Sequence, residues 1–551
     1  MASRRDALRW IVGAPLLARS LAACGGATPR APHVQGELLG QSLDVGHRVR
    51  DLGQPGGPSL GDFRGAPEER VKLAIVGGGP AGLSAAWRLT RRGELDYQLF
   101  ELESEVGGTS AWQETGVAPH PWGAHYLPLP MKENVELLGL LGELGALDGV
   151  DAMGEPMGSE EMLIREPEER VFYGGFWYPG LYPYAGASED DLRQLRRFRA
   201  ELDRWTRFHD AAGRRAFTIP RSLASDDAEV MALDRVSATD WLAQLGLNSP
   251  RLEWLVRYAC RDDYGLEPHE TSAWALVFYW ASRTVKPGHD TRDLLAWPEG
   301  NGRLVKHLRR AAGDRIRTGR VVLNVEQSEG GVTLRMLDVT SGRPLIVHAE
   351  RAILATPHFV TRKLLGLGAG ELEMGYGSWV VANLHLESRP VERGFPLAWD
   401  NVPHGSEALG YVVATHQLDL DRGPSIFTWY RPLTGRDPAD ERRRMLDTSF
   451  EEWRDGVLTD LAIPHPDLGS RVRRLDVWRW GHAMPQPRVG LLSSASLRRA
   501  REARGRLHFA HTDLSGMALF EESFDHGLRA ADELLAALAP PATSASAVEP
   551  T

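Results

Sequence analysis

The stretch VKLAIVGGGPAGLSAAWRL, Val71 to Leu89, decides the fold class. Its first six residues are almost all apolar, which is typical of a strand buried on both faces of a parallel sheet. Pro80 stands where the first turn of a helix tolerates proline, and Gly93 ends that helix after two arginines. The stretch therefore predicts a strand, a glycine-rich turn and a helix, which is the first unit of an α/β domain.

Gly77, Gly79 and Gly82 lie in the predicted turn. The first glycine permits the tight turn, the second lets a pyrophosphate approach the backbone, and the third lets helix and strand pack closely. A second predicted strand, Tyr97 to Phe100, ends in Glu101, where a carboxylate can accept hydrogen bonds from ribose hydroxyls. The spacing favours a dinucleotide site over a turn without a ligand, and it does not separate NAD from FAD.

The segment after Glu101, ELESEVGGTS, places Gly107 and Gly108 at the spacing seen in flavoproteins of the amine oxidase and phytoene desaturase superfamily, which this chain resembles. The resemblance implies FAD as the cofactor and a Rossmann-like FAD-binding domain interleaved with an α+β substrate domain, and it places Val322 beside the adenine. Further segments resemble that superfamily in the order in which it shows them: HPWGAHYL (His120 to Leu127), WPEGNGRLVKHL (Trp297 to Leu308), GRVVLNVEQ (Gly319 to Gln327), AILATP (Ala352 to Pro357) and GRLHFAHTDLSGMALFEESFDHGLRAADEL (Gly505 to Leu534).

The last of these segments predicts a short strand, an acid and an amphipathic helix. The resemblance assigns Asp513 to a ribitol hydroxyl, and the helix start can direct N–H groups at the flavin pyrimidine. Two departures stand out. His511 and Thr512 precede the acid where the superfamily usually has Ala-Gly, and Glu521 is followed by Glu522 instead of glycine.

The resemblance also divides the chain into domains. The segments that are typical of a nucleotide site alternate with two insertions, the first largely helical and the second strand-like. The expected parts are a signal peptide with a lipobox (1–24), a Gly- and Pro-rich tether (25–69), an FAD-binding domain (70–127, 296–370 and 499–538), a substrate domain (128–295 and 371–498) and a disordered tail (539–551). An apolar patch at Gly36 to Val45 indicates that the tether docks in part.

The first residues, SRRDALRWIVGAPLLARSLAAC, resemble a twin-arginine export signal that ends in a bacterial lipobox. Arg4 and Arg5 form the positive region, the apolar run is too short and interrupted to span a bilayer, and Cys24 would be acylated. The resemblance implies an exported, extracytoplasmic lipoprotein that touches the membrane only through its anchor. The alternative is an accidental basic and alanine-rich start.

Composition narrows the possible partners of this 551-residue chain. A formal net charge of -10 without a basic tract argues against nucleic-acid binding. The two cysteines, Cys24 and Cys260, leave no internal disulfide if Cys24 is lipidated. His482 has no other ligand type near it at a recognisable spacing, so no metal site is predicted.

Three residues are candidates for catalysis. His125 lies in the segment that the resemblance places beside the flavin, where it could orient substrate or transfer a proton, and a buried structural histidine is the alternative. Asp262 and Asp263, next to an aromatic residue, suit a cationic amine, and a helix-ending turn is the alternative. Cys260 and Lys306 are expected to be an inert buried thiol and a solvated helical lysine.

Several amine oxidases of the superfamily carry a lysine on a substrate-domain strand, and the counterpart here, GSWVVANLHL (Gly377 to Leu386), contains none. We therefore expect an FAD-dependent oxidoreductase that takes a hydride from a small organic substrate, first an amine or polyamine, and passes electrons to oxygen or a quinone. The alternatives are a desaturase or C–C oxidase of an isoprenoid-like substrate, which an apolar tunnel would favour, and a non-catalytic flavin-binding envelope protein, which a blocked flavin site would favour.

Overall fold

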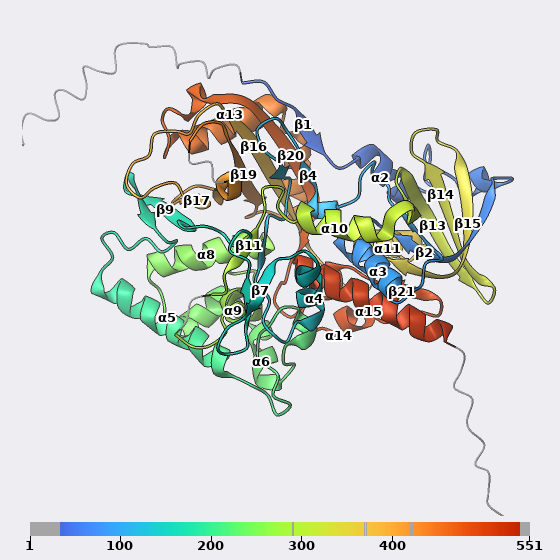
Figure 1. Ribbon diagram of the computed structural model, residues 1–551, viewed down its shortest axis with the longest axis horizontal. Coiled ribbons are helices and arrows are strands. Elements are labelled where there is room, and N and C mark those ends of the chain that lie inside the picture. The colour runs from blue at the N-terminus through green and yellow to red at the C-terminus, as the bar shows by residue number, and fades with distance from the viewer. Residues whose placement is uncertain (1–33, 289–290, 369, 371, 419–421, 540–551) are drawn as a thin grey trace, which may run out of the picture.

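The computed structural model describes residues 34–288, 291–368, 370, 372–418 and 422–539, which form two lobes (Figure 1). The first lobe is built on a mainly parallel sheet in the order β12-β3-β2-β15-β14-β13, and β21 also pairs with β15. Its strands are β2 (Glu68–Val76), β3 (Tyr97–Phe100), β12 (Ile316–Arg317), β13 (Arg320–Ser328), β14 (Gly331–Asp338), β15 (Pro344–Leu354) and β21 (Leu507–Phe509).

Alternate residues of β2 face two different layers of this lobe. Leu73 and Ile75 pack against the helices α3 (Pro80–Arg91), α10 (Gly302–Ala312) and α15 (Phe520–Leu538). Ala74 and Val76 point the other way, into the core shared with β13, β14 and β15. Because both faces of β2 are covered, its residues read as the continuous apolar run of a buried parallel strand.

The second lobe contains an eight-stranded sheet in the order β1-β20-β16-β19-β18-β17-β9-β10. Its helices α12 (Pro438–Asp447) and α13 (Phe450–Ala462) pack against one face of β16, and an aromatic cluster covers the other face. The strands are β1 (Leu38–Gly40), β9 (Glu169–Tyr173), β10 (Phe176–Pro179), β16 (Tyr376–Leu386), β17 (Asp400–Pro403), β18 (Gly410–Val413), β19 (Ser425–Leu433) and β20 (Val472–Pro485).

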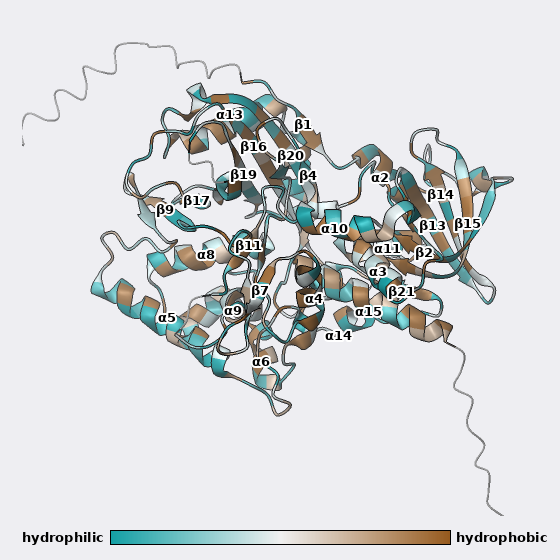
Figure 2. Cartoon of the chain, in the orientation of Figure 1, coloured by the Kyte–Doolittle hydropathy of each residue, from teal (hydrophilic) through white to brown (hydrophobic). Residues whose placement is uncertain are grey.

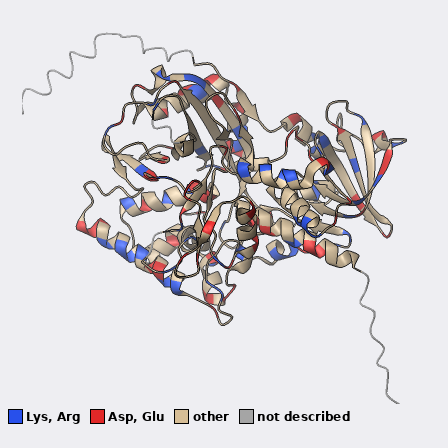
Figure 3. Cartoon of the chain, viewed as in Figure 1, with Lys and Arg blue, Asp and Glu red and all other residues tan. Residues whose placement is uncertain are grey.

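A helical layer completes the second lobe below this sheet in Figure 1. Its longest helix, α5, mixes apolar and polar residues along its length (Figure 2). Its first turn is acidic and mostly basic residues follow (Figure 3). The apolar residues of α5 join a core with the other helices. The helices of this layer are α5 (Glu189–Arg207), α6 (Ala228–Ala232), α7 (Ala238–Gln244), α8 (Pro250–Tyr264) and α9 (Ala273–Ala281).

Part of the segment predicted as a tether is ordered and joins both lobes. β1 adds a parallel edge strand to β20, and α2 (Leu43–Arg50) packs near β13. Phe63, in η2 (Leu60–Phe63), is buried with Val321 and Leu323. The apolar residues of this Gly- and Pro-rich segment thus find partners that lie hundreds of residues away in the sequence.

No helix in the described part of the chain has the length and apolar character that a bilayer crossing requires. Short elements connect the layers of the two lobes. They are η3 (Gly108–Ser110), β4 (Trp112–Gln113), β5 (His120–Pro121), β6 (Tyr126–Pro128), α4 (Val135–Glu143), β7 (Leu147–Val150), β8 (Pro156–Gly158), η4 (Arg221–Leu223), η5 (Leu233–Arg235), β11 (Leu294–Ala296), η6 (Gly313–Arg315), α11 (His358–Leu364), η7 (His416–Leu418), η8 (Leu468–Ser470), α14 (Ala495–Ala500) and η9 (Thr512–Leu514).

Candidate active site

The glycine turn between β2 and α3 is closed on one side and open on the other. Gly77 has φ +106°, and a Cβ there would lie 2.5 Å from the carbonyl oxygen of Ala355. A Cβ on Gly82 would lie 1.9 Å from the carbonyl oxygen of Gly77. At Gly79 the nearest atom to such a Cβ is the Cα of Gly108, 3.9 Å away. The turn therefore leaves space for a ligand above the first N–H groups of α3, which is the arrangement that binds a pyrophosphate.

Glu101 lies beside this turn at the end of β3. Its Oε2 accepts a hydrogen bond from the N–H of Gly78 (2.6 Å) and its Oε1 accepts one from the N–H of Glu103 (2.8 Å). Burial raises the pKa of this carboxyl group. The N–H of Gly107 donates to the carbonyl oxygen of Gly78 (2.9 Å), which holds the second glycine loop against the first. Leu102 also donates a backbone hydrogen bond to Glu101, and the carboxylate, with about four lone-pair positions, retains capacity for a ribose hydroxyl. Val322, which the resemblance places beside adenine, is buried in β13.

Asp513 is buried in η9, directly after β21. Its Oδ2 accepts hydrogen bonds from the Tyr376 hydroxyl (2.5 Å) and the His358 N–H (2.7 Å), and its Oδ1 lies 2.9 Å from Nδ1 of His511. Burial raises the pKa of Asp513, but His511, Tyr376 and the His358 N–H outweigh burial and leave it below the ordinary value. The site thus holds an ionised carboxylate, which can accept a hydrogen bond from a ribitol hydroxyl.

Glu522, the departure from the superfamily pattern, has its own partners. Its Oε1 accepts a hydrogen bond from the backbone N–H of Arg221 (2.6 Å), and burial raises its pKa to about 8. Ser515 also hydrogen-bonds this carboxyl group. Ala518 and Leu519, just before α15, keep accessible surface. Glu522 is therefore held toward η4 and η9. The residues of this lobe fit an FAD, because they supply a glycine cradle for the pyrophosphate, an acid for the ribose and an acid for the ribitol.

The last turn of α8 carries the two predicted aspartates, and the structure gives them different surroundings. Asp263 forms a buried ion pair with Arg283 (2.7 Å). Asp262 forms no ion pair in the described part of the chain; its Oδ2 accepts a hydrogen bond from the Tyr279 hydroxyl (3.1 Å). Burial raises the pKa of Asp262, and the neighbouring Asp263 raises it further. Gly265 ends the helix in the left-handed conformation with φ 57°, so the aspartates lie in a helix-ending turn and also belong to an acidic cluster.

Two carboxylates that the sequence analysis missed lie near Asp262. Asp400 and Glu169 are direct register partners in the parallel pair β17 and β9. The Oδ2 of Asp400 accepts a hydrogen bond from the Tyr258 hydroxyl (3.1 Å). Burial raises the pKa of Asp400 well above its ordinary value, with further contributions from Asp262 and Glu169, and burial raises that of Glu169 to about 7. All three carboxylates keep part of their surface accessible although they are desolvated, so we infer that they line an interior cavity.

We call the space lined by Asp262, Asp400 and Glu169 the acidic cavity, and aromatic rings form the rest of its lining. His125 stacks on Tyr430 with ring centroids 4.7 Å apart, and Trp399 and Tyr126 lie 5.5 and 5.1 Å from its centroid. Tyr258, whose hydroxyl donates to Asp400, packs in the same cluster as Tyr430 and Trp399, so the rings and the carboxylates lie together. Burial lowers the pKa of His125 to about 4. The imidazole is therefore neutral at pH 7 and can orient a substrate, but it lacks the additional proton that a general acid would donate.

The first turn of α15 lies near the Asp263–Arg283 ion pair, because Glu521 and Arg283 line one small cavity. Burial raises the pKa of Glu521 to about 7, and its electrostatic neighbours are Arg283 and Asp263. Tyr126 interacts with Asp263 and with Glu521. The helix start that the FAD-binding lobe contributes therefore borders the acid-lined space of the other lobe, which is where a substrate and a flavin would meet.

The face of β16 that carries Trp379 and Val381 is aromatic and apolar at these two positions. Val381 is buried among tryptophans, and no residue of β16 is a lysine. Trp480 donates a hydrogen bond from Nε1 to the carbonyl oxygen of Trp122 (2.5 Å), and Trp122 stacks on Trp478 at 5.3 Å. These rings exclude water from the side of the cavity that faces the sheet.

The remaining candidates lie outside this cavity. Burial raises the pKa of Cys260 to about 12, so its thiol is unreactive at neutral pH. Lys306 forms ion pairs with Glu114 (2.7 Å) and Glu299 (3.3 Å) on the surface of α10. His482 stacks on Phe359 at 4.4 Å in a separate cavity. No group of three or more metal-ligating side chains occurs among the residues that the structure describes.

The fold and the site define a class: an α/β flavoprotein oxidoreductase in which an FAD-binding lobe meets a lobe that encloses the substrate. The profile of the family described as flavin containing amine oxidoreductase matches residues 80–535. The chain belongs to this family, its cofactor is FAD, and it acts as an FAD-dependent oxidoreductase on a small molecule.

Solved structures share this fold. A putrescine oxidase bound to putrescine superposes with a TM-score of 0.63 at 19% identity, covering 85% of this chain and 100% of that one. Cyclohexylamine oxidase from Brevibacterium oxydans IH-35A gives a TM-score of 0.61 at 17% identity, covering 85% and 99%. A thiamine thiazole synthase from Desulfosudis oleivorans is 55% identical over 38 residues, so the match spans 7% of this chain and 14% of that curated relative.

Proposed function

We propose that this protein oxidises a cationic amine, with a diamine or polyamine as the preferred class. The observation that carries the proposal is the group of three carboxylates, Asp262, Asp400 and Glu169, which form no ion pair in the described part of the chain and share a cavity with aromatic rings. An ammonium group is the partner that neutralises desolvated carboxylates, and aromatic faces attract the same cation.

The cavity suits a substrate with two amine groups. One ammonium would bind Asp262, Asp400 and Glu169, while the alkyl chain lies along Tyr430 and Trp399. The second amine would then reach the start of α15, where FAD, when bound, accepts two electrons and a proton from the substrate carbon. His125, being neutral, would orient this end of the substrate.

The two alternatives fit the cavity less well. Burial of an isoprenoid-like chain against desolvated carboxylates would leave those carboxylates without a partner, which is costly. A non-catalytic role would suit a blocked cofactor site, whereas the space above Gly79 is open and Glu522 is held by Arg221. We propose oxygen as the electron acceptor, in line with the oxidases that share the fold, and a quinone is the second candidate.

The direct test is a substrate panel under anaerobic conditions. The FAD-loaded protein is mixed in turn with putrescine, spermidine, cyclohexylamine and a C40 isoprenoid, and bleaching of the flavin absorbance is followed. We expect bleaching by the amines, fastest with the diamine or the triamine. Bleaching by the isoprenoid alone would contradict the proposal. Mixing the reduced protein with oxygen or with a soluble quinone then identifies the faster acceptor.

We also propose that the protein is exported by the twin-arginine route and anchored through Cys24. The support is the sequence pattern of residues 3–24, which lies outside the described residues. This route suits a protein that folds around FAD before export. Replacing Arg4 and Arg5 by lysines is expected to leave a yellow, FAD-loaded precursor inside the cell. Unchanged export of that variant would refute the route, and export of a Cys24→Ala variant without loss of membrane association would refute the anchor.

A further inference from the structure

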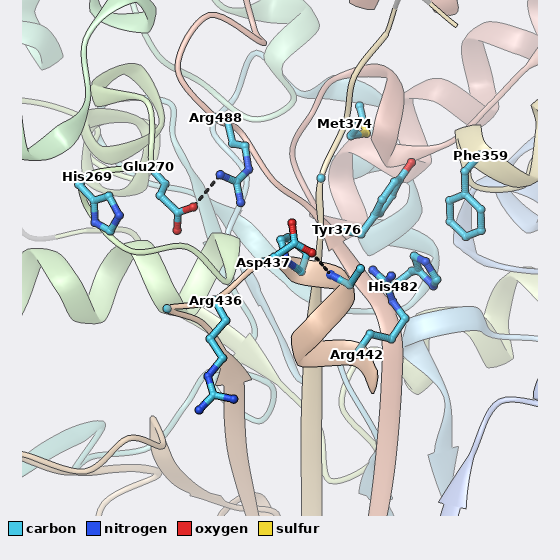
Figure 4. A pocket seen from close by; sticks show the side chains of 14 residues that line it. His269, Glu270, Phe359, Met374, Tyr376, Arg436, Asp437, Arg442, His482 and Arg488 are labelled. Atoms are coloured by element: carbon cyan, nitrogen blue, oxygen red, sulfur yellow. Dashed lines mark hydrogen bonds and ion pairs between the residues drawn. The ribbon is translucent and has the colours of Figure 1, made fainter. Parts of the chain in front are cut away.

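A second cavity, of about 770 Å³, is lined by none of the carboxylates and aromatic rings named above for the acidic cavity. It forms where α11 and the start of β16 meet the end of β20 and the N-terminus of α12 (Figure 4). Its size is in the range of cavities that bind small organic molecules. Its residues contribute to neither the glycine cradle nor the carboxylate group described above.

Three arginines line this second cavity, and one of them, Arg436, pairs with Glu441 (3.8 Å). Nε of Arg442 donates a hydrogen bond to the carbonyl oxygen of Gly481 (2.7 Å). Asp437 is an electrostatic neighbour of Arg442, but no carboxylate of the described residues lies within ion-pair distance of this guanidinium. Arg488 is different, because its charge is neutralised by Glu270 at 2.6 Å. Asp437 accepts a hydrogen bond from the N–H of Ala439 and serves as the N-cap of α12. The free Nη groups of Arg442 therefore give the cavity a site for an anion.

One wall of the second cavity is aromatic. Phe359 and His482 stack with ring centroids 4.4 Å apart, and Tyr376 meets both rings at steep angles, 5.1 Å from Phe359 and 5.7 Å from His482. Burial lowers the pKa of His482 to about 4, so this ring is neutral at pH 7. A flat ring is the ligand shape that packs on such a wall.

The same wall leads to the cofactor site. The Tyr376 hydroxyl donates to Oδ2 of Asp513 (2.5 Å), the carboxylate assigned to the ribitol chain. A ligand that packs on Tyr376 therefore lies one hydrogen bond away from an FAD-binding residue. Such a ligand is expected to alter the environment of the flavin without entering the acidic cavity.

From this geometry we propose that the second cavity binds a small aromatic carboxylate, with Arg442 pairing with the carboxylate and the Phe359–His482 pair packing on the ring. Tyr376 transmits occupancy to Asp513. Arg442 supplies the charge and the rings supply the shape, so both parts of the ligand are required. The site does not depend on which amine the protein oxidises.

Titration calorimetry with the FAD-loaded protein tests this proposal, with indole-3-acetate as the probe and indole-3-acetamide and inorganic phosphate as comparisons. We expect saturable binding of the carboxylate, at least tenfold weaker binding of the neutral amide, and no binding of phosphate. Arg442→Gln should weaken indole-3-acetate binding at least tenfold. The matched control is Arg443→Gln, since Arg443 is exposed on the same helix and paired with Asp440; it should leave the affinity unchanged.

Flavin absorbance tests the coupling. Indole-3-acetate should shift the visible spectrum of the flavin in the wild-type protein. The Tyr376→Phe variant should still bind indole-3-acetate, but its flavin spectrum should not shift. Equal binding of acid and amide, an unaffected Arg442→Gln variant, or no binding of indole-3-acetate would each overturn the proposed site. A spectral shift that persists in Tyr376→Phe would overturn the coupling. Failure of amine oxidation would leave the calorimetric result unaffected, so the two proposals fail separately.

Discussion

Asp262→Asn tests the role of the carboxylates in amine binding. The substitution removes a charge but keeps an oxygen that can accept the hydrogen bond from Tyr279, which lies 3.1 Å away. A charge-assisted hydrogen bond contributes about 1.5 to 3 kcal/mol, which corresponds to about tenfold to a hundredfold in affinity. We therefore expect kcat/KM for putrescine to fall by that factor at pH 8, where the carboxylate is available, and by less at pH 6.

The assay is stopped-flow bleaching of the flavin under anaerobic conditions, which is independent of the electron acceptor. The matched control is Asp455→Asn on α13, where Asp455 is exposed and pairs with Arg454 at 2.8 Å. That variant should match the wild type. If Asp262→Asn retained the wild-type kcat/KM at pH 8, or if both variants lost activity equally, the carboxylates would not be the amine-binding groups.

Three further outcomes are expected. Gly82→Ala should abolish FAD retention, because its Cβ would lie 1.9 Å from the Gly77 carbonyl oxygen. The control Gly139→Ala should retain FAD, because a Cβ there has no other atom within 4 Å. A Gly82→Ala protein that is still yellow would contradict the turn geometry. Glu101→Gln should raise the Kd for FAD about tenfold to a hundredfold in fluorescence titrations, and an unchanged Kd would remove its ribose role. In the wild type, kcat/KM should rise through about pH 7 as carboxylates such as Glu169 ionise. His125→Gln should show the same rise, because burial lowers the pKa of His125 to about 4. If the variant lost the rise, His125 would be the group that titrates.

The nucleotide-binding half could be predicted from local patterns. The strand, turn and helix around Gly77 occur as expected, with β2 beginning at Glu68 and α3 ending at Arg91. The strand at Tyr97–Phe100 and the helix starting at Phe520 are also present. These elements are readable because each one carries its own apolar period and its own turn residues.

The acidic cavity could be predicted only in part. Asp262 could be predicted as a site residue because it is adjacent to another acid in the sequence. Asp400 and Glu169 begin separate strands, and they lie close together because β17 pairs with β9. The ion pair of Asp263 with Arg283 likewise depends on how α8 packs against α9. No local pattern encodes such contacts, because they are set by tertiary packing of segments that are distant in sequence.

The N-terminal segment illustrates the same limit. Its Gly and Pro content and the apolar patch at Gly36 to Val45 predict a tether that docks in part, without indicating where. In the structure, β1 pairs with β20, and Ser42 donates from its hydroxyl to a carboxylate oxygen of Glu103 (2.6 Å). The short apolar runs of the segment are too weak to predict structure alone. They become ordered because an open sheet edge and an uncovered face of β13 are present.

A single-turnover product analysis determines whether this protein is an FAD-dependent oxidase of cationic amines. The FAD-loaded protein is mixed with putrescine without oxygen, and flavin bleaching, aldehyde and ammonia are quantified together. We expect one aldehyde and one ammonia for each flavin bleached, since water hydrolyses the oxidised amine. A purified protein that shows no flavin spectrum and takes up no FAD on reconstitution, or a flavin that stays oxidised with every amine tested, would contradict it.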